Sequence, residues 1–129
     1  MNILDEDINT SERQLLEKWR IRVRQIGYEV GRKGMKDHEI ISFLQQRRQT
    51  TFFSNDRDYF LAHLCHANYC LVHLDVKKKE TASFIRRFLR HPEFDNQAKR
   101  MGKVIQVTTE HIYVCQLNAE GKRMLTWIT

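Results

Sequence analysis

Acidic residues follow two short apolar stretches of this chain. Residues 50–53 are β-branched and aromatic, which is typical of a buried strand, and Asp56 and Asp58 come just after them. Residues 2–4 form a shorter apolar run that stops at Asp5. Because the carboxyl ends of parallel strands share one edge of a sheet, we expect these carboxylates to lie close together.

Two more acids, Asp37 and Glu39, begin a segment with the apolar period of a helix. Clustered carboxylates repel one another unless a cation neutralises them. Hard divalent cations prefer carboxylate oxygens and water, and such an ion can stabilise the charge that builds on a phosphodiester under attack. The set therefore indicates metal-dependent phosphodiester hydrolysis. The simpler alternative is that each acid only caps a helix or lies in a solvated loop.

These acids lie in a chain that is basic overall. Its 129 residues carry a formal net charge of +6, which favours polyanionic partners and nucleic acid first. Phosphate contacts would come from basic residues after a predicted strand and on a predicted helix, namely Lys77, Lys78, Lys79, Arg86, Arg87 and Arg90. The alternative is that these bases are only the solvated face of the helix.

The length and a hydrophobic content of 41% suit a single folded domain. No apolar run approaches the roughly 18 residues of a membrane span, and the first residues lack the pattern of a signal peptide. We therefore expect a cytoplasmic protein that makes no membrane contact. The odd number of cysteines, Cys65, Cys70 and Cys115, indicates reduced thiols.

Strands and helices are expected to alternate along the first half of the chain. After the strand at residues 2–4, apolar residues recur with helical spacing over residues 11–26, and Gly27 is placed to end that helix. Residues 20–24 also alternate like a half-buried strand, but the longer period favours the helix. A short strand over residues 28–30 and a helix over residues 37–48 follow.

The second half predicts a short helix after Asp58, a strand over residues 69–74 and a helix that Pro92 ends. Residues 103–108 and 111–117 are expected to form an antiparallel pair. We therefore predict a three-layer α/β domain over residues 1–117, with a mostly parallel sheet and an antiparallel C-terminal edge. The tail, residues 118–129, shows no clear element and would dock on the domain or on a partner through Leu125, Trp127 and Ile128.

Four motifs occur in a fixed order along the chain: Ile3-Leu4-Asp5-Glu6-Asp7, Ile26-Gly27-Tyr28-Glu29-Val30, Asp37-His38-Glu39-Ile40 and Ser54-Asn55-Asp56-Arg57-Asp58-Tyr59-Phe60. The ordered set resembles the small PIN-like proteins related to the toxins of bacterial toxin–antitoxin pairs, and the likeness spans residues 1–117. Two departures are mild: Asp7 stands where this group often has Asn, and Ser54 where Thr is usual.

The resemblance implies a PIN-like endoribonuclease, the toxin half of a pair, in which a water activated by Mg²⁺ or Mn²⁺ hydrolyses RNA. Asp5 and Asp56 would be the surest metal ligands, with Asp37 or Glu39 and Asp58 completing the set. Asp58 and Glu39 would bind a second ion or position the water. RNA, an antitoxin protein and a second copy of the chain are the implied partners.

Three other hypotheses remain open. The chain could be a non-catalytic PIN-like module that binds RNA or a protein partner. A receiver domain would need a phospho-acceptor, for which Asp56 could serve, and a Lys that ends a later strand. A zinc site would draw on a set of residues whose spacing fits none of the usual patterns: His63, Cys65, His66, Cys70 and His73.

Overall fold

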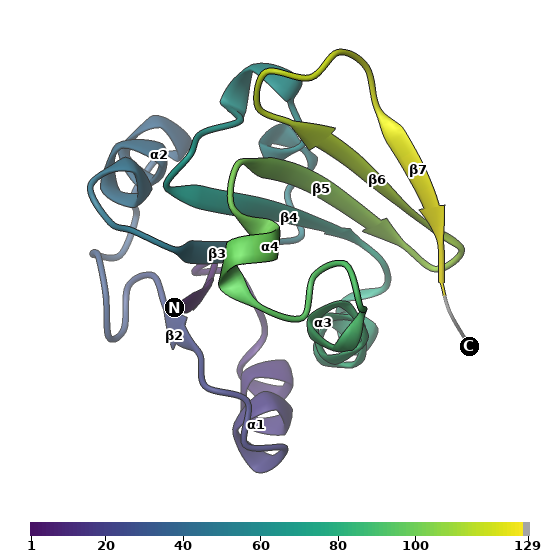
Figure 1. Cartoon of the computed structure of the whole chain (residues 1–129). Coiled ribbons are helices and arrows are strands. Elements are labelled where there is room, and N and C mark those ends of the chain that lie inside the picture. The colour runs from purple at the N-terminus through teal and green to yellow at the C-terminus, as the bar shows by residue number, and fades with distance from the viewer. Residues whose placement is uncertain (128–129) are drawn as a thin grey trace.

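A seven-stranded sheet runs through residues 1–127, the part of the chain that this computed structural model describes (Figure 1). The strand order is β2-β1-β3-β4-β5-β6-β7. Their bounds are β1 Asn2–Leu4, β2 Arg24–Gln25, β3 Thr50–Ser54, β4 Tyr69–Asp75, β5 Lys103–Thr108, β6 His111–Gln116 and β7 Arg123–Thr126. The first five strands pair in parallel, and β6 and β7 add antiparallel pairs. The predicted mostly parallel sheet with an antiparallel C-terminal edge is confirmed.

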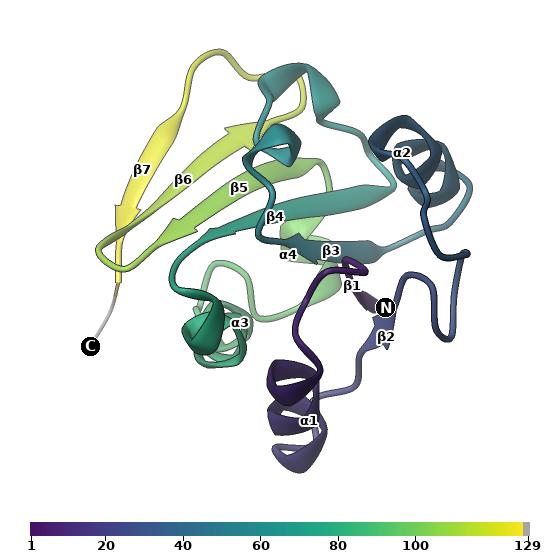
Figure 2. The same cartoon turned by 180° about the vertical axis from the view of Figure 1, so that it is seen from behind.

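Helices cover both faces of this sheet. They are α1 Thr10–Lys18, α2 Asp37–Gln45, α3 Thr81–Arg90 and the short α4 Gln97–Arg100, with 3₁₀ turns at Arg57–Tyr59, Ala62–Leu64 and Lys78–Glu80. Helices α1 and α3 pack on one face and α2 on the other, which gives three layers (Figures 1 and 2). Within residues 1–127, no helix has the length and apolar character needed to cross a membrane.

Two apolar rows cross the sheet in register and form the two halves of the core. The row on the α2 face consists of Ile3, Phe52, Leu71 and Val104. The row one residue further along faces α1 and α3 and consists of Leu4, Phe53, Val72 and Ile105. All eight side chains are fully buried, as expected for parallel strands that are covered on both faces.

The predicted helix over residues 11–26 is wrong in its second half, because α1 ends at Lys18. Arg20 adopts a left-handed conformation with φ 62°, which breaks the helix. The chain then runs extended, and Arg24–Gln25 pair with β1 as the edge strand β2. The alternating pattern of residues 20–24 was therefore the better guide. The predicted strand over residues 28–30 is also wrong, since Val30 makes only an isolated bridge with Ile26.

Helix α2 begins at Asp37 as predicted but ends at Gln45. The helix predicted after Asp58 is replaced by the two 3₁₀ turns, and α4 was not predicted. The expectation of no regular element in the tail is wrong for β7, which pairs with β6. The indole N–H of Trp127 donates to the carbonyl oxygen of Thr108 at 2.8 Å, so this part docks on the sheet. Ile128, expected to dock with it, lies outside the described residues.

Candidate metal centre

The order of the strands reverses between β1 and β3, since the chain passes from β1 to β2 on one side and then returns to β3 on the other. In open α/β sheets, ligands bind in the crevice outside the carboxyl ends of the strands at such a point. Asp5 follows β1 directly, and its backbone N–H donates to the carbonyl oxygen of Phe53 in β3 at 2.9 Å. Asp56 follows two residues after β3. Both acids therefore lie at the switch point.

A polar row crosses the sheet at the same edge, two residues beyond the apolar row on the α2 face. Its members are Asp5, Ser54, His73 and Gln106. The Ser54 hydroxyl donates to Oδ2 of Asp5 at 2.7 Å, and Nε2 of Gln106 lies 3.1 Å from Nδ1 of His73. The apolar core thus gives way to hydrogen-bonding groups where the strands end.

Three aspartates meet beside this row. Asp37 is the first residue of α2, and Asp56 and Asp58 lie in the loop after β3; one carboxylate oxygen from each lies within 4.8 Å of the others. Mg²⁺ binds oxygen at about 2.0–2.1 Å, so oxygens on opposite sides of one ion lie about 4.2 Å apart. The three carboxylates match a hard divalent cation in chemistry, and the limit of 4.8 Å on their separation is close to this span. The site can therefore hold a metal ion.

Local hydrogen bonds fix these aspartates. The carboxylate of Asp56 accepts the backbone N–H of Asp58 at 2.9 Å, and the N–H of Asp56 donates to the Ser54 hydroxyl at 2.9 Å. Ser54 therefore contacts both Asp5 and the backbone of Asp56. Since Ser54 is fully buried, its hydroxyl holds the ends of β1 and β3 together.

Tyr59 positions the third aspartate. Its hydroxyl donates to Oδ1 of Asp37 at 2.9 Å, and its ring packs edge-on against Phe52 with the centroids 5.1 Å apart. Burial, followed by the negative charge of Asp5 and the hydrogen bond to Asp37, raises the pKa of Tyr59 far above its usual value. The phenol therefore stays a donor. Its role was not predicted, although an aromatic residue directly after Asp58 was a signal.

Asp5, which was expected to be among the surest metal ligands, is half-buried and lies beside the group of three aspartates without belonging to it. Burial raises the pKa of its carboxyl, the hydrogen bonds from Ser54 and from the N–H of Glu6 partly offset this, and the charges of Asp7 and Asp37 raise it further. Its carboxylate is thus held in an environment that favours an added cation.

The turn after Asp5 is fixed by Gln25, a buried residue of β2. The amide nitrogen of Gln25 donates to the carbonyl oxygens of Asp5, Glu6 and Ile8 at 3.0, 3.1 and 3.0 Å. The two N–H groups of this amide are thus shared among three backbone acceptors. The edge strand that the helix prediction missed is therefore what shapes the loop carrying Asp5.

Glu39 is not brought into the aspartate group. It is the third residue of α2, and its carboxylate accepts the backbone N–H of Lys36 at 3.1 Å and a hydrogen bond from the Arg32 guanidinium. These interactions hold the pKa of Glu39 below its usual range. The structure thus gives Glu39 the role of a helix cap.

The predicted basic residues separate into two locations. Lys77, Lys78 and Lys79 are exposed just after β4, at the same edge of the sheet as the aspartates. Arg86 and Arg87 lie on α3, over the rings of Trp19 and Trp127 at 3.7 and 4.4 Å from the ring centroids, and Arg90 is exposed at the end of that helix. Since α3 covers the face opposite α2, only the lysines share the carboxyl edge.

The zinc set is not brought together. Cys70 is buried on the face of α1 and α3, where burial raises the pKa of its thiol to about 12, whereas His73 belongs to the polar row on the other face. The His66 ring stacks on Tyr69. Within residues 1–127, Asp37, Asp56 and Asp58 form the one group of at least three metal-ligating side chains.

A small polar pocket of about 240 Å³ lies beside the aspartates and was not predicted. It is lined by Asn55, Arg57, His73, Asp75 and Gln106. Burial lowers the pKa of His73, so its imidazole is neutral at pH 7. The pocket thus combines neutral polar side chains with one basic and one acidic residue, Arg57 and Asp75.

Comparisons of the chain with protein-family models, with curated proteins and with solved structures found no match. The class of protein is therefore defined here by fold and site alone. It is an α/β protein whose mostly parallel sheet carries a group of aspartates at its switch point. Any more specific assignment is a proposal.

Proposed function

We propose that this protein is a metal-dependent ribonuclease of the PIN-like kind that uses Mg²⁺ or Mn²⁺. The observation that carries the proposal is the meeting of the carboxylates of Asp37, Asp56 and Asp58 within 4.8 Å at the switch point of the sheet. The net charge of +6 supports a polyanionic substrate, because the acids are a local exception in a basic chain.

In this proposal the three aspartates hold the ion, and Asp5 adds negative charge beside them. A bound ion of this type supplies a Lewis acid and lowers the pKa of a coordinated water. Tyr59 orients Asp37, Ser54 orients Asp5, and the lysines at 77–79 hold the RNA backbone near the edge. We leave Glu39 outside the proposed ligand set, because Arg32 and the Lys36 N–H occupy its carboxylate.

The finer assignment is that the protein is the toxin half of a toxin–antitoxin pair and acts on RNA in the cytoplasm. Its support is the ordered resemblance of the four sequence motifs. An antitoxin protein and a second copy of the chain are then the expected protein partners. Co-purification of the untagged chain with its genomic neighbour, followed by mass measurement of the complex, tests both partners.

The structure lacks a lysine that the receiver-domain hypothesis requires within the described residues. A receiver needs a lysine at the end of a strand later than the one carrying the phospho-acceptor, but β4 ends at Asp75 and β5 at Thr108. The antiparallel strands end at Gln116 and Thr126. We therefore do not retain this alternative.

A non-catalytic module that binds RNA or a protein remains the second candidate. The observation that favours it is the ion pair of Glu39 with Arg32, which removes one acid from the expected set. The two candidates differ in one measurable property, since a module would bind RNA equally well with and without a divalent ion and leave it intact.

The decisive experiment is cleavage of mixed RNA substrates by the purified protein with Mg²⁺, with Mn²⁺ and with a chelator. Replacing a residue that hydrogen-bonds to a metal ligand typically lowers metal affinity or activity about 10–100-fold. Replacing the ligand itself, as in Asp56→Asn, should therefore lower the cleavage rate by at least about 100-fold. Asp95→Asn is the matched control, because Asp95 is an exposed acid that is paired with Lys99 outside the aspartate group. Unchanged cutting by Asp56→Asn would falsify the assignment.

A further inference from the structure

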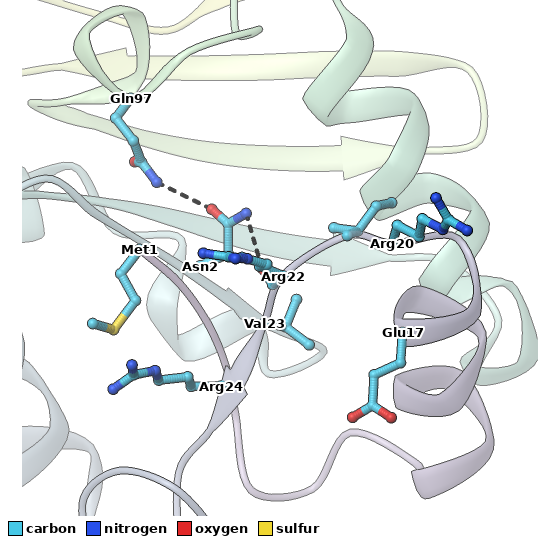
Figure 3. A pocket seen from close by; sticks show the side chains of 9 residues that line it. Met1, Asn2, Glu17, Arg20, Arg22, Val23, Arg24 and Gln97 are labelled. Atoms are coloured by element: carbon cyan, nitrogen blue, oxygen red, sulfur yellow. Dashed lines mark hydrogen bonds between the residues drawn. The ribbon is translucent and has the colours of Figure 1, made fainter.

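A hollow of about 790 Å³ lies at the opposite end of the strands, where β1 begins and the chain enters β2 (Figure 3). Three arginines line it, Arg20, Arg22 and Arg24, and between them Ile21 and Val23 supply an apolar floor. We call this hollow the arginine groove. Figure 3 shows Arg24 extending toward Met1, while Glu17 approaches from α1 on the other side.

The arginine groove carries positive charge that the rest of the described chain does not neutralise. Its three arginines are exposed, and within residues 1–127 none of them forms an ion pair with a carboxylate. The one acid in the lining, Glu17, is already paired with Arg13 at 3.0 Å. The groove is therefore complementary to an anionic ligand that spans several positions.

An exposed aromatic ring stands past the other end of β2. Tyr28 is 55% exposed, and its ring has Nζ of Lys33 at 5.4 Å and the guanidinium carbon of Arg13 at 5.8 Å from the centroid. Arg13 is itself paired with Glu17 and Glu29, so Lys33 is the cation beside the ring that a phosphate would meet, and an exposed ring of this kind is one on which an unpaired base stacks. No such platform was expected from the sequence.

The groove, the ring and the aspartates lie within a short reach of one another. Asn2 at the groove and Asp5 at the acidic site are joined by strand β1, and three residue steps of an extended strand span about 10 Å. Between them the edge strand β2 has no further strand on its outer side. A flexible polyanion lying along this edge would therefore reach from the arginines to the aspartates.

We propose that the arginine groove and Tyr28 bind single-stranded RNA and lead it along the β2 edge to the aspartate group. This inference rests on the proposed function, since it assigns the substrate path of that site. A single strand is favoured over a duplex because only an unpaired base can stack on Tyr28. The path differs from one across α3, where Arg86 and Arg87 already lie over rings of their own chain.

The test is fluorescence anisotropy of a fluorescein-labelled single-stranded RNA of mixed sequence, with the full chain in chelator so that no cleavage occurs. The double variant Arg22→Ala/Arg24→Ala should weaken binding by at least about tenfold and reduce the slope of log affinity against log salt by about 1.4. The matched control is Arg87→Ala/Arg90→Ala, which removes the same charge from α3 and should stay within about twofold.

A second pair of variants tests the ring. Tyr28→Ala should weaken binding by at least about fivefold, the lower end of what one stacked base contributes, and Tyr28→Phe should restore it. Circular dichroism before binding confirms that each variant is folded. Equal losses in the groove and α3 variants would overturn the path, as would equally tight binding of duplex RNA or displacement of the RNA by a polyglutamate peptide.

The binding assay also separates this inference from the nuclease proposal. If RNA binds through the groove but is not cut with either metal, the RNA path is supported and the nuclease proposal is excluded. If the groove variant cuts RNA with an unchanged KM, the RNA path is excluded and the nuclease proposal stands.

Discussion

The two ends of the parallel strands each enclose one charged side chain, and neutral groups are its hydrogen-bonding partners at both ends. At the carboxyl edge, Asp5 accepts from the Ser54 hydroxyl at 2.7 Å and from a backbone N–H at 2.8 Å. At the amino edge, the buried guanidinium of Arg100 donates to Asn2 and Thr51 at 3.2 and 3.0 Å. Both charged side chains are therefore held by neutral hydrogen-bonding groups, but the residues around those groups differ between the two edges.

The amino edge forms a closed network, because Gln97 joins the partners of Arg100 by bonds of 2.7 Å to Thr51 and 3.1 Å to Asn2. At the carboxyl edge, burial raises the pKa of Asp5, and the charges of the carboxylates of Asp7 and Asp37 raise it further. The network around Arg100 is complete as it stands, whereas the carboxylates around Asp5 gain from a cation. The comparison therefore identifies Arg100 as a structural residue and Asp5 as part of a site that is completed by a cation.

The largest expected effect on stability is at the closed network. Arg100→Met fills the space but removes the guanidinium donor from Asn2, from Thr51 and from the carbonyl oxygen of Asn96, and each unsatisfied buried group costs about 1–3 kcal/mol. We expect the free energy of unfolding to fall by about 2–4 kcal/mol in urea denaturation.

Arg90→Met is the control for that change, because Arg90 is exposed on α3. Its free energy of unfolding should stay within about 0.5 kcal/mol of the parent. If Arg100→Met were as stable as this control, the guanidinium would not be structural and the contrast between the two edges would be lost.

The second effect is the response of the carboxyl edge to a metal. A divalent ion at about 100 times its Kd should add about 2.7 kcal/mol of stability, seen as a rise in Tm in thermal melts with Mn²⁺. Asp58→Asn should remove most of this rise, because it deletes one of the three clustered carboxylates. Asp95→Asn should leave it intact, since Asp95 is paired with Lys99 outside the cluster. If the Tm of Asp58→Asn rose with Mn²⁺ as much as that of the parent, the ion would bind at another site.

The sequence predicts the carboxyl edge better than the amino edge. The apolar runs of β1 and β3 and the start of α2 are local patterns, and they suffice to deliver Asp5, Asp37 and Asp56 to one place. Strand β2 has only two residues, and its pairing partner β1 is about 20 residues away in the chain. Local helical spacing could not reveal that pairing, and so the arginine groove was missed.

Two features of the site also depend on contacts that spacing does not encode. Arg32 reaches Glu39 from a loop seven residues earlier, and this removes an acid that its position at the start of α2 seemed to offer. Tyr59 reaches Asp37 from 22 residues away, which requires α2 to be packed on the sheet. Side-chain pairing of this kind follows from the tertiary fold.

The smallest effect concerns the pH dependence of stability. Asp5 has a raised pKa in the folded protein, so the fold favours its protonated form relative to the unfolded chain. The free energy of unfolding should therefore fall as the pH rises from the usual aspartate value of 3.8 through the folded pKa. Asp95 is the opposite case, because Lys99 lowers its pKa and stabilises the carboxylate.

Asp5→Asn should therefore be at least as stable as the parent at pH 7 without metal, and the difference should shrink as the pH falls toward 4. The amide oxygen keeps one acceptor, and the Ser54 hydroxyl can accept from the new amide in place of donating. Asp95→Asn should instead lose stability at pH 7. Urea denaturation over this pH range measures both, and a less stable Asp5→Asn would mean that the cluster is already neutralised by the protein itself. If Asp5→Asn were more stable than the parent without metal but its Tm no longer rose with Mn²⁺, the carboxylate of Asp5 would lower the stability of the metal-free protein and be required for binding the cation.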